Sequence, residues 1–425
     1  MKSSTGSFLV NAGPLLLVLF IDGMGLGLVI PILNELIFGA GSSLFIHGSI
    51  SPAMHNMIYG LTIGIFMFCW FFGAAILGDL SDRIGRKKSL IICLLGAFLS
   101  YVISAISVLS HSLTLLILGR VIAGFTSGSQ PIAQAAIIDL SSDADKARNI
   151  GLILLAISLG FILGPLFGGI LADNRIVSWF DFTTPFYFAA LVSFLNILLL
   201  LWLFHDTQPK PLGRFKIDFY QAIYIFTSAF SHPRIKKLSI LYFIYIFGWS
   251  SFYSFIALFL IKRYGYSPTV VSLFMALMGA GFAFGTGVLV NYLTRRFSLR
   301  SNFIANTLLT GVLTLLMVVI PNSLASWILI APLSTFIAVS YSCIVTLFSN
   351  EVEADKQGWV MGITGSIMAF VWGINGIIVG MLALWSANLP ILLAAIVLAL
   401  AAILTLFLYQ ESAMIVPSQR PPSIH

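Results

Sequence analysis

Apolar residues fill long stretches of the chain, and short polar segments separate these stretches. A helix needs about 20 residues to cross the hydrocarbon core of a bilayer, and the apolar stretches have that length. They begin near residues 9, 57, 89, 113, 148, 184, 237, 269, 301, 324, 357 and 389. The first stretch has no small-residue cleavage site, so we expect it to be retained as a span. The pattern predicts an all-α, multi-pass membrane protein with twelve transmembrane helices.

The composition supports the membrane assignment and narrows the chemistry. Of the 425 residues, 59% are hydrophobic and 9% are charged, whereas about a quarter of the residues in a soluble domain are charged. The three cysteines lie inside apolar stretches and the six histidines in loops or at span edges, so we expect neither a metal site nor a catalytic site. There is no G-x-x-x-x-G-K-S/T phosphate loop. We therefore expect no cofactor and no enzymatic activity.

The distribution of Lys and Arg predicts the orientation. If Met1 is cytoplasmic, 18 of the 22 basic residues lie on the cytoplasmic side, three lie outside, and Arg120 lies within a span. Cytoplasmic loops of membrane proteins collect Lys and Arg, so both termini are expected in the cytoplasm. This distribution also accounts for the net charge of +7 without a nucleic-acid partner.

One long polar segment, from about His205 to Lys237, divides the spans into six and six. Between Asp218 and Phe230, aromatic and polar residues mix at near-helical spacing. Both a helix on the cytoplasmic membrane face and an unstructured linker fit this segment. The predicted parts are a first bundle at 1–205, a linker at 206–236, and a second bundle with a short tail at 237–425.

The two halves are similar to each other. Asp143-Ala-Asp-Lys146, before the fifth span, recurs as Glu353-Ala-Asp-Lys356 before the eleventh. A repeat at equivalent positions indicates duplication, and duplicated bundles are typical of transporters whose substrate site lies near the midplane between the repeats.

The loop after the second span, Gly78-Asp-Leu-Ser-Asp-Arg-Ile-Gly-Arg-Lys-Lys88, interleaves acids, bases and glycines. A solvated loop accounts for the bases but not for the acids or for the glycines, which suit a tight turn. The loop resembles the signature Gly-x-Leu-Ala-Asp-Arg-x-Gly-Arg-Lys of the major facilitator superfamily. The resemblance implies two six-helix bundles around a central cavity, and a network that closes the cytoplasmic side when the outside is open. The residues it assigns to this latch are Gly78, Asp82, Arg83, Gly85, Arg86 and, in the fourth span, Asp139.

Three further segments resemble motifs of the drug:proton antiporter branch, which includes the bacterial tetracycline efflux pumps: Asp22–Pro31, Leu118–Gly124 and Gly160–Gly169. The resemblance implies antiport, multidrug efflux and a bacterial inner-membrane location. Residues 301–320 contain no acid, whereas the tetracycline pumps place one in the ninth span, so tetracycline is a poor candidate substrate.

The antiporter-like motif places glycines at four-residue spacing in the fifth span, where another helix can approach closely. Its proline removes a helical hydrogen bond and can kink the helix. We expect a flexible seam between the halves, ordinary small-residue packing, or both. The residues are Gly160, Gly164, Pro165, Gly168 and Gly169.

Two ionisable residues lie well inside predicted spans, and such residues are functional by default. Asp22 lies near the middle of the first span, where a carboxyl can bind and release a proton as access alternates. Arg120 stays charged and must be paired or hydrated. The resemblance implies that Asp22 and Arg120 form the proton-coupling pair. A permanent ion pair and a structural arginine bonded to helix carbonyls are the alternatives.

The seventh span carries Tyr242, Tyr245, Trp249 and Tyr253 at spacings of 3, 4 and 4, which puts them on one helical face. Such a stripe either packs, forms an interfacial belt, or lines a substrate cavity suited to a bulky, partly apolar or cationic ligand. The uncharged polar residues expected at cavity depth are Gln130, Gln134 and Asn375.

These observations predict a proton-coupled secondary transporter that moves a small organic molecule by alternating access, with efflux favoured. A proton-coupled importer of a siderophore or another metabolite is the alternative, and a non-transporting receptor is a more distant one. The expected partners are the substrate, protons and the lipid bilayer, and the expected state is monomeric.

Overall fold

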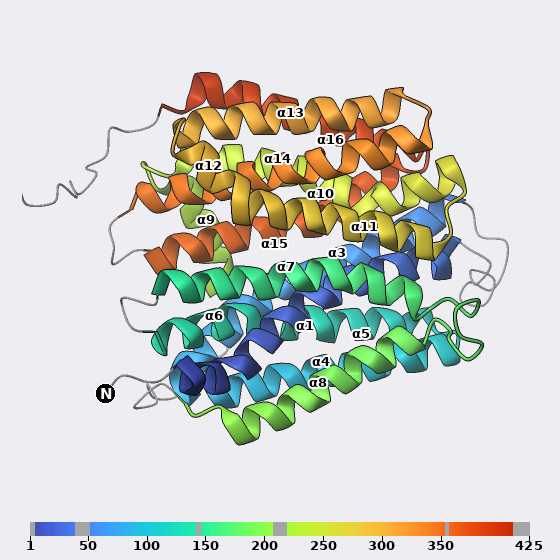
Figure 1. Cartoon of the computed structure of the whole chain (residues 1–425), viewed down its shortest axis with the longest axis vertical. Helices are drawn as coiled ribbons and strands as arrows, with labels where there is room; N and C mark the ends of the chain where they lie inside the picture. Colours follow the sequence, from blue (N-terminus) through green and yellow to red (C-terminus); the bar gives the residue numbers. More distant parts are fainter. Residues whose placement is uncertain (1–4, 39–51, 142–145, 207–218, 353–356, 411–425) are drawn as a thin grey trace, which may run out of the picture.

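The computed structural model describes residues 5–38, 52–141, 146–206, 219–352 and 357–410, and helices are the regular elements of these ranges (Figure 1). In chain order they are α1 (Thr5–Phe38), α3 (Pro52–Ile84), α4 (Arg86–Leu109), α5 (Leu113–Thr126), α6 (Ser129–Asp139), α7 (Lys146–Ile170), α8 (Thr184–Leu203), α9 (Tyr220–Ser231), α10 (Lys236–Tyr264), α11 (Pro268–Phe284), the π-helix η1 (Gly285–Leu289), α12 (Val290–Thr294), α13 (Leu299–Val319), α14 (Ser323–Asn350), α15 (Gln357–Leu382) and α16 (Asn388–Leu408).

The twelve-helix membrane fold is confirmed. In the described part of the chain, eleven elements are long and apolar enough to cross a membrane, with η1 and α12 continuing α11. The short helices α5 and α6 follow one another along the bundle and together supply the twelfth crossing (Figure 1). Each observed span begins within five residues of its predicted start.

The fourth span is broken into α5 and α6, which the hydrophobic pattern did not predict. Pro131 has no N–H to donate to the Ser127 carbonyl, and the chain turns at Ser127 and Gly128 before α6 begins at Ser129. A Cβ on Gly128 would lie 2.6 Å from the carbonyl oxygen of Gly73, so α3 packs directly against the break.

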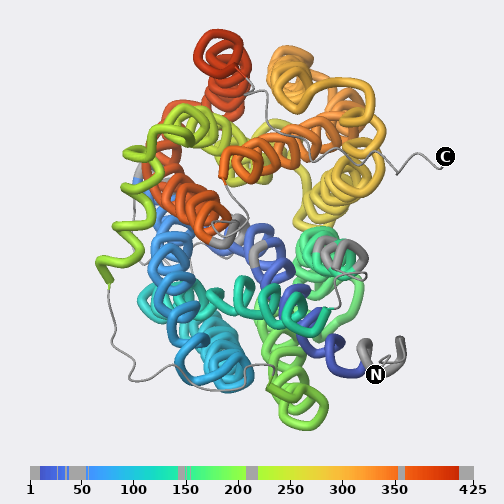
Figure 2. Tube along the Cα trace, turned by 90° about the vertical axis from the view of Figure 1, so that its left-hand side faces the viewer, coloured from blue at the N-terminus to red at the C-terminus, as the bar shows by residue number. Residues whose placement is uncertain are grey.

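The helices pack as two halves that share a boundary. Helices α1 and α3 to α8 pack chiefly among themselves, and so do α10, α13, α14 and α16. Helices α11 and α15 of the second half lie at the boundary, where α11 packs most against α7 and α15 most against α3. Figure 2 shows the first half below and the second above. Contacts between α3 and α15 and between α7 and α11 join the halves. We call the end that carries Arg86, Arg234 and Arg295 the basic end, and the end that carries Asp173 and Asn322 the distal end.

The halves are bonded to each other in the distal part of the boundary. The Tyr59 hydroxyl of α3 donates a 2.8 Å hydrogen bond to the carbonyl of Ser254 in α10. The Thr269 hydroxyl at the start of α11 donates a 2.5 Å bond to the Asp173 carboxylate after α7.

Glycine environments show the same asymmetry. In the distal half of the bundle, a Cβ on Gly64 would lie 2.8 Å from the Gly373 carbonyl oxygen, and one on Gly279 would lie 2.7 Å from the Ile162 side chain. Toward the basic end, α7, η1 and α15 carry glycines that have open space where a side chain would be. These are Gly151, Gly287, Gly362 and Gly365.

Helix α9 settles the open question about the linker over Tyr220–Ser231, where the segment is helical, while Asp218 lies outside the described residues. Its Phe226 ring lies 6.0 Å from Phe71 of α3 and 4.4 Å from Phe370 of α15, measured between centroids. The helix therefore contacts both halves near the basic end.

Candidate functional site

Asp22 lies at the point where α1 passes the break in the fourth span. Its carboxylate accepts a 2.7 Å hydrogen bond from the hydroxyl of Ser129, the first residue of α6. A helix N-terminus carries a partial positive charge that favours anions, and Gly128 before it provides no capping side chain. The break therefore presents both a hydroxyl and a helix end to the buried carboxylate.

Arg120 is a buried cation on α5, with 5% of its surface exposed. Its Nε donates a 3.3 Å bond to the Thr62 carbonyl oxygen, and its guanidinium carbon lies 4.2 Å from the centroid of the Phe66 ring. Arg120 makes no ion pair with any carboxylate that the structure describes, Asp22 included. In this conformation, Arg120 therefore bonds a helix carbonyl, as the alternative of a structural arginine predicts.

Asp22 and Arg120 nevertheless line the same enclosed space. A cavity of about 20 Å³ lies between α1, α3, α4 and α5, which is room for about one water molecule. Its lining residues are Ile21, Asp22, Gly25, Phe66, Ala97, Ser100, Tyr101, Arg120, Ala123 and Ser127. The predicted pair is thus brought together around a water-sized cavity rather than in direct contact.

Sequence reasoning missed the polar residues that complete this site. Tyr101 lines the cavity from α4, and Ser129 holds the carboxylate. The position of Ser129 two residues before Pro131, at a helix start, was a signal that could have found it. Tyr101, in an α4 face that also carries Ser100 and Ser104, gave a weaker signal.

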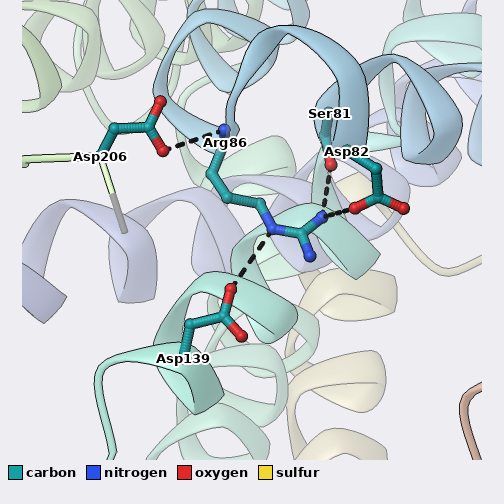
Figure 3. A network of polar contacts seen from close by, with 5 residues as sticks. All are labelled: Ser81, Asp82, Arg86, Asp139 and Asp206. Atoms are coloured by element: carbon teal, nitrogen blue, oxygen red, sulfur yellow. Dashed lines mark hydrogen bonds and ion pairs between the residues drawn. The ribbon is translucent and has the colours of Figure 1, made fainter. Parts of the chain in front are cut away.

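The signature loop forms a compact ionic network around Arg86, the first residue of α4 (Figure 3). Its Nη1 lies 2.7 Å from the Asp82 carboxylate and 2.5 Å from the Ser81 hydroxyl. Its Nε lies 3.5 Å from Asp139 at the end of α6. The structure thus links α3, α4 and α6 through one guanidinium.

Gly85 occupies a backbone conformation that glycine favours, with φ of +99°. A Cβ at this position would collide with the carboxylate of Asp206, which accepts a 3.2 Å bond from the Arg86 backbone N–H. Asp206 follows α8 and was not predicted as part of the site. The glycine therefore permits both the turn from α3 to α4 and the approach of this second acid.

The other two latch residues lie outside this network. Arg83 bonds Asp79 one turn earlier in α3, at 2.8 Å. Gly78 has open space where a side chain would be. The structure places the guanidinium of Arg83 in a local pair, whereas that of Arg86 bridges helices.

The glycines of the antiporter-like motif contact α1 more than the boundary between the halves. A Cβ on Gly160 would lie 2.8 Å from the Met24 nitrogen, and one on Gly164 would lie 2.5 Å from the Met24 carbonyl oxygen. Gly168 lies against Leu28 in the same way, and Pro165 lies against Gly27. In this conformation these four residues therefore pack within the first half, as the small-residue alternative predicts.

Gly169 does face the other half. A Cβ at this position would collide with the hydroxyl of Ser272 in α11 and lie 3.0 Å from the carbonyl oxygen of Pro268. Helix α7 thus touches α1 through most of its motif and α11 through the last glycine.

The aromatic stripe of α10 divides into two environments. Tyr242 and Tyr245 are fully buried inside the second half, and Tyr245 donates a 2.8 Å bond to the Ile337 carbonyl. Trp249 is half-buried and stacks on Phe252 at 5.8 Å. In this conformation Tyr242 and Tyr245 therefore pack inside the second half, as the packing alternative predicts.

Tyr253 lies at the boundary between the halves. Its ring centroid lies 5.3 Å from that of Trp372 in α15 and 6.5 Å from that of Phe161 in α7. The Tyr253 hydroxyl and the Trp372 indole N–H are both buried and have no hydrogen-bond partner among the described atoms. These groups are available to a ligand that enters the boundary.

The predicted amides differ in how they are bonded. Asn375 donates a 2.7 Å bond to the Ser251 hydroxyl and a 3.2 Å bond to the Phe247 carbonyl, while its own oxygen is buried without a described partner. Gln130 and Gln134 are half-buried on α6. Asn375 ties α15 to α10 within the second half.

The sequence matches a known family profile, and the fold matches solved structures of transporters. The sequence profile of the Major Facilitator Superfamily matches residues 15–377 and, in a second match, residues 238–423. Among solved structures, the D-xylose-proton symporter superposes with a TM-score of 0.74 at 16% identity, covering 95% of this chain and 98% of the symporter. The human organic anion transporter MFSD10 (TETRAN) superposes with a TM-score of 0.70 at 20% identity, covering 94% of this chain and 99% of MFSD10.

The fold and the profile together define the chain as a multi-pass membrane transporter for small molecules, not an enzyme. It belongs to the Major Facilitator Superfamily. It is 27% identical to the tetracycline resistance protein, class C, of Escherichia coli over 345 residues, which cover 80% of this chain and 82% of that protein. It is 28% identical to the quinolone resistance protein NorA of Staphylococcus aureus over 371 residues, which cover 86% and 87%.

Proposed function

We propose that this chain is a proton-coupled antiporter that exports a small organic molecule with a bulky, partly apolar structure by alternating access. The similarity to tetracycline and quinolone resistance proteins supports export. The absence of an acid from residues 301–320 disfavours tetracycline as the substrate.

One observation carries the proton-coupling proposal: Asp22 and Arg120, buried on different helices, line one water-sized cavity without an ion pair between them. A single water in that cavity can relay a proton to the carboxylate. The Ser129 hydroxyl and the start of α6 stabilise the charged form of Asp22. Any movement of α6 away from α1 removes that stabilisation and favours the protonated form, so conformation and protonation are linked.

The conformation supports an inward-facing assignment. The halves are joined by Tyr59 and Asp173 toward the distal end, and glycines toward the basic end have open space. We place the basic end in the cytoplasm because Lys and Arg collect there. Both termini are then cytoplasmic, in the inner membrane of a bacterium.

The latch proposal follows from the same assignment. Asp82 pairs with Arg86 inside the first half, and 49% of its side chain is exposed. Its exposed oxygen is free to reach a helix N-terminus of the second half when the basic end closes. We therefore propose that Asp82, Arg86 and Asp139 stabilise the outward-facing state more than the state seen here.

The boundary between the halves is the proposed substrate site. Trp249, Tyr253 and Trp372 supply aromatic surface, and the Tyr253 hydroxyl and the Trp372 indole N–H have no partner among the described atoms. The Asn375 oxygen adds an acceptor. Such a site suits a planar or cationic organic molecule. We take 1–205 and 237–425 as the two rocking units of a functional monomer, with 206–236 as the linker.

The test is transport in proteoliposomes. Purified protein is first screened by thermal shift against drugs, siderophores and metabolites, and each stabilising compound is then assayed for flux under an imposed pH gradient. Proton-driven movement of the compound in the direction opposite to the protons supports antiport. Co-movement with protons would instead support the importer, and no proton-linked flux of any stabilising compound would contradict the proposal.

A further inference from the structure

A second, larger pocket lies at the basic end, away from Asp22 and Arg120. It has a volume of about 580 Å³ and lies between α9, the turn into α10 and the start of α15. Ligand sites commonly occupy about 300–1,000 Å³. The lining residues are Tyr224, Thr227, Ser228, Ser231, His232, Pro233 and Trp359.

The lining combines hydroxyl groups with aromatic rings. Thr227, Ser228 and Ser231 each donate their hydroxyl hydrogen to a carbonyl of α9, which leaves their oxygens able to accept bonds from a ligand. The His232 ring packs on Trp359 with 5.2 Å between centroids. The pocket therefore suits a ligand that brings its own hydroxyl donors.

Cations cluster immediately beside the pocket. Arg234, Lys236 and Lys237 follow its lining residue Pro233, and all three are exposed. None of them makes an ion pair with an acid in the described part of the chain. This cluster can bind an anion, and no acid of the described residues pairs with it.

Helix α9 also carries the side chains of a membrane–water interface. Tyr220 is 79% exposed and Tyr224 is 71% exposed, with Phe219 and Ile223 exposed beside them. Tyrosine side chains with one apolar and one polar end are typical of the headgroup level of a bilayer. Of these exposed side chains, that of Tyr224 also lines the pocket.

We propose that this pocket binds an anionic phospholipid with a hydroxyl-bearing headgroup, of the phosphatidylglycerol type. Arg234, Lys236 and Lys237 bind the phosphate, and the hydroxyls of α9 accept bonds from the headgroup glycerol. Basic pockets beside transmembrane helices bind such headgroups. The same helix contacts α3 and α15 through Phe226, so the bound lipid fixes α9 against both halves.

The experiment measures lipid binding to the full chain in neutral detergent, by native mass spectrometry and by the thermal shift on titration with dioleoyl phosphatidylglycerol or dioleoyl phosphatidylcholine. Each basic residue at an anionic surface strengthens binding about fivefold. The double variant Arg234→Gln with Lys237→Gln is therefore expected to bind phosphatidylglycerol about 25-fold more weakly. The matched control is Arg295→Gln with Arg296→Gln, which removes two exposed cations at the same end that, unlike Arg234, do not adjoin a lining residue in the chain. We expect the control to bind as the unaltered chain does.

A third variant separates the pocket from its charge. Ser231→Trp places a bulky ring in the pocket, removes one lining hydroxyl and leaves every cation in place, so it is expected to weaken phosphatidylglycerol binding. Retention of binding by Ser231→Trp, or equal losses in the two double variants, would mean that surface charge alone attracts lipid and would overturn the proposal. Equal binding of phosphatidylcholine, or displacement of the lipid by glycerol phosphate at comparable concentration, would also overturn it.

Discussion

The contact between Gly164 and α1 predicts that one added methyl group will disturb the proton site from the neighbouring helix. A Cβ at Gly164 would lie 2.5 Å from the Met24 carbonyl oxygen, whereas ordinary contacts begin at 3.4 Å. Both sides of this contact are helix backbone, so α1 and α7 must separate by about 0.9 Å, which costs about 1–3 kcal/mol as overpacking.

That displacement reaches Asp22, two residues before Met24 on α1. The Ser129–Asp22 hydrogen bond is 2.7 Å long, and movement of Asp22 by about 0.9 Å away from Ser129 would stretch it beyond useful hydrogen-bond length. Gly164→Ala is therefore expected to lower the unfolding temperature and to reduce proton-driven flux, although residue 164 faces neither the cavity nor the boundary between the halves.

The control is Gly151→Ala on the same helix, where a Cβ has no neighbour within 4 Å. Both substitutions gain the same helix propensity, about 1 kcal/mol, so their difference isolates the contact with α1. The assays are thermal unfolding in detergent and flux in proteoliposomes at matched protein content. Equal unfolding temperatures and equal flux in the two variants would refute the argument that the glycine face fixes α1.

Three further substitutions probe the other contacts. Arg120→Ala should reduce proton-driven flux more than Arg120→Lys does, because alanine loses both the charge and the cation–π contact, which is worth about 2 kcal/mol when desolvated. Equal flux in the two variants and in the unaltered chain would leave Arg120 only a structural role. Asp82→Asn should slow turnover and raise the inward-open fraction, measured by cysteine-accessibility labelling. Thermal stability should fall little, because the exposed ion pair of Asp82 with Arg86 is worth about 1 kcal/mol or less. Unchanged labelling and turnover would exclude the latch role. The hydrogen bond from Thr269 holds the pKa of Asp173 below its ordinary value. This contact should therefore stabilise the distal closure fully above the ordinary carboxyl pKa of about 3.9, and the stabilisation should be lost as the pH falls through the lowered pKa. If the distal closure of Asp173→Asn depended on pH as that of the unaltered chain does, this prediction would be contradicted.

The fold was predictable because hydrocarbon imposes one strong rule. Every spanning segment must satisfy its backbone internally, so the apolar stretches became helices with starts close to those expected. The near-helical spacing after Asp218 left a helix and an unstructured linker open, and the structure has α9 there. The break in the fourth span was missed although the polar run Thr126-Ser-Gly-Ser-Gln-Pro131 interrupts the apolar stretch there. Polar residues also occur inside continuous spans, and the effect of Gly128 and Pro131 depends on the backbone of α3 at Gly73.

The site was predictable as a set of residues but not as an arrangement. Buried charge in an apolar span identified Asp22 and Arg120, yet the cavity between them depends on how four helices cross. A permanent ion pair and an arginine bonded to helix carbonyls were both open alternatives, and the structure gives Asp22 a serine hydroxyl and Arg120 a carbonyl and a ring. Asp206 was missed for the same reason, since it follows α8 and meets Gly85 only through tertiary packing.

The α10 stripe shows the limit of periodicity. Spacing places Tyr242 and Tyr253 on one helical face, but a long helix that lies partly inside one half and partly at the boundary presents the same face to two surroundings. Neighbouring helices, which periodicity does not specify, decide which tyrosine packs and which reaches a ligand.

The central claim, that Asp22 couples proton movement to transport, is tested most directly by flux of the identified substrate in proteoliposomes containing Asp22→Asn. The amide keeps the shape and can still accept the Ser129 bond, but it cannot titrate. The account predicts that Asp22→Asn binds substrate and exchanges it down its own gradient, yet does not concentrate it when a pH gradient is imposed. Asp181→Asn, which changes a carboxylate outside the spans, should accumulate substrate normally. Accumulation by Asp22→Asn equal to that of Asp181→Asn would contradict the account.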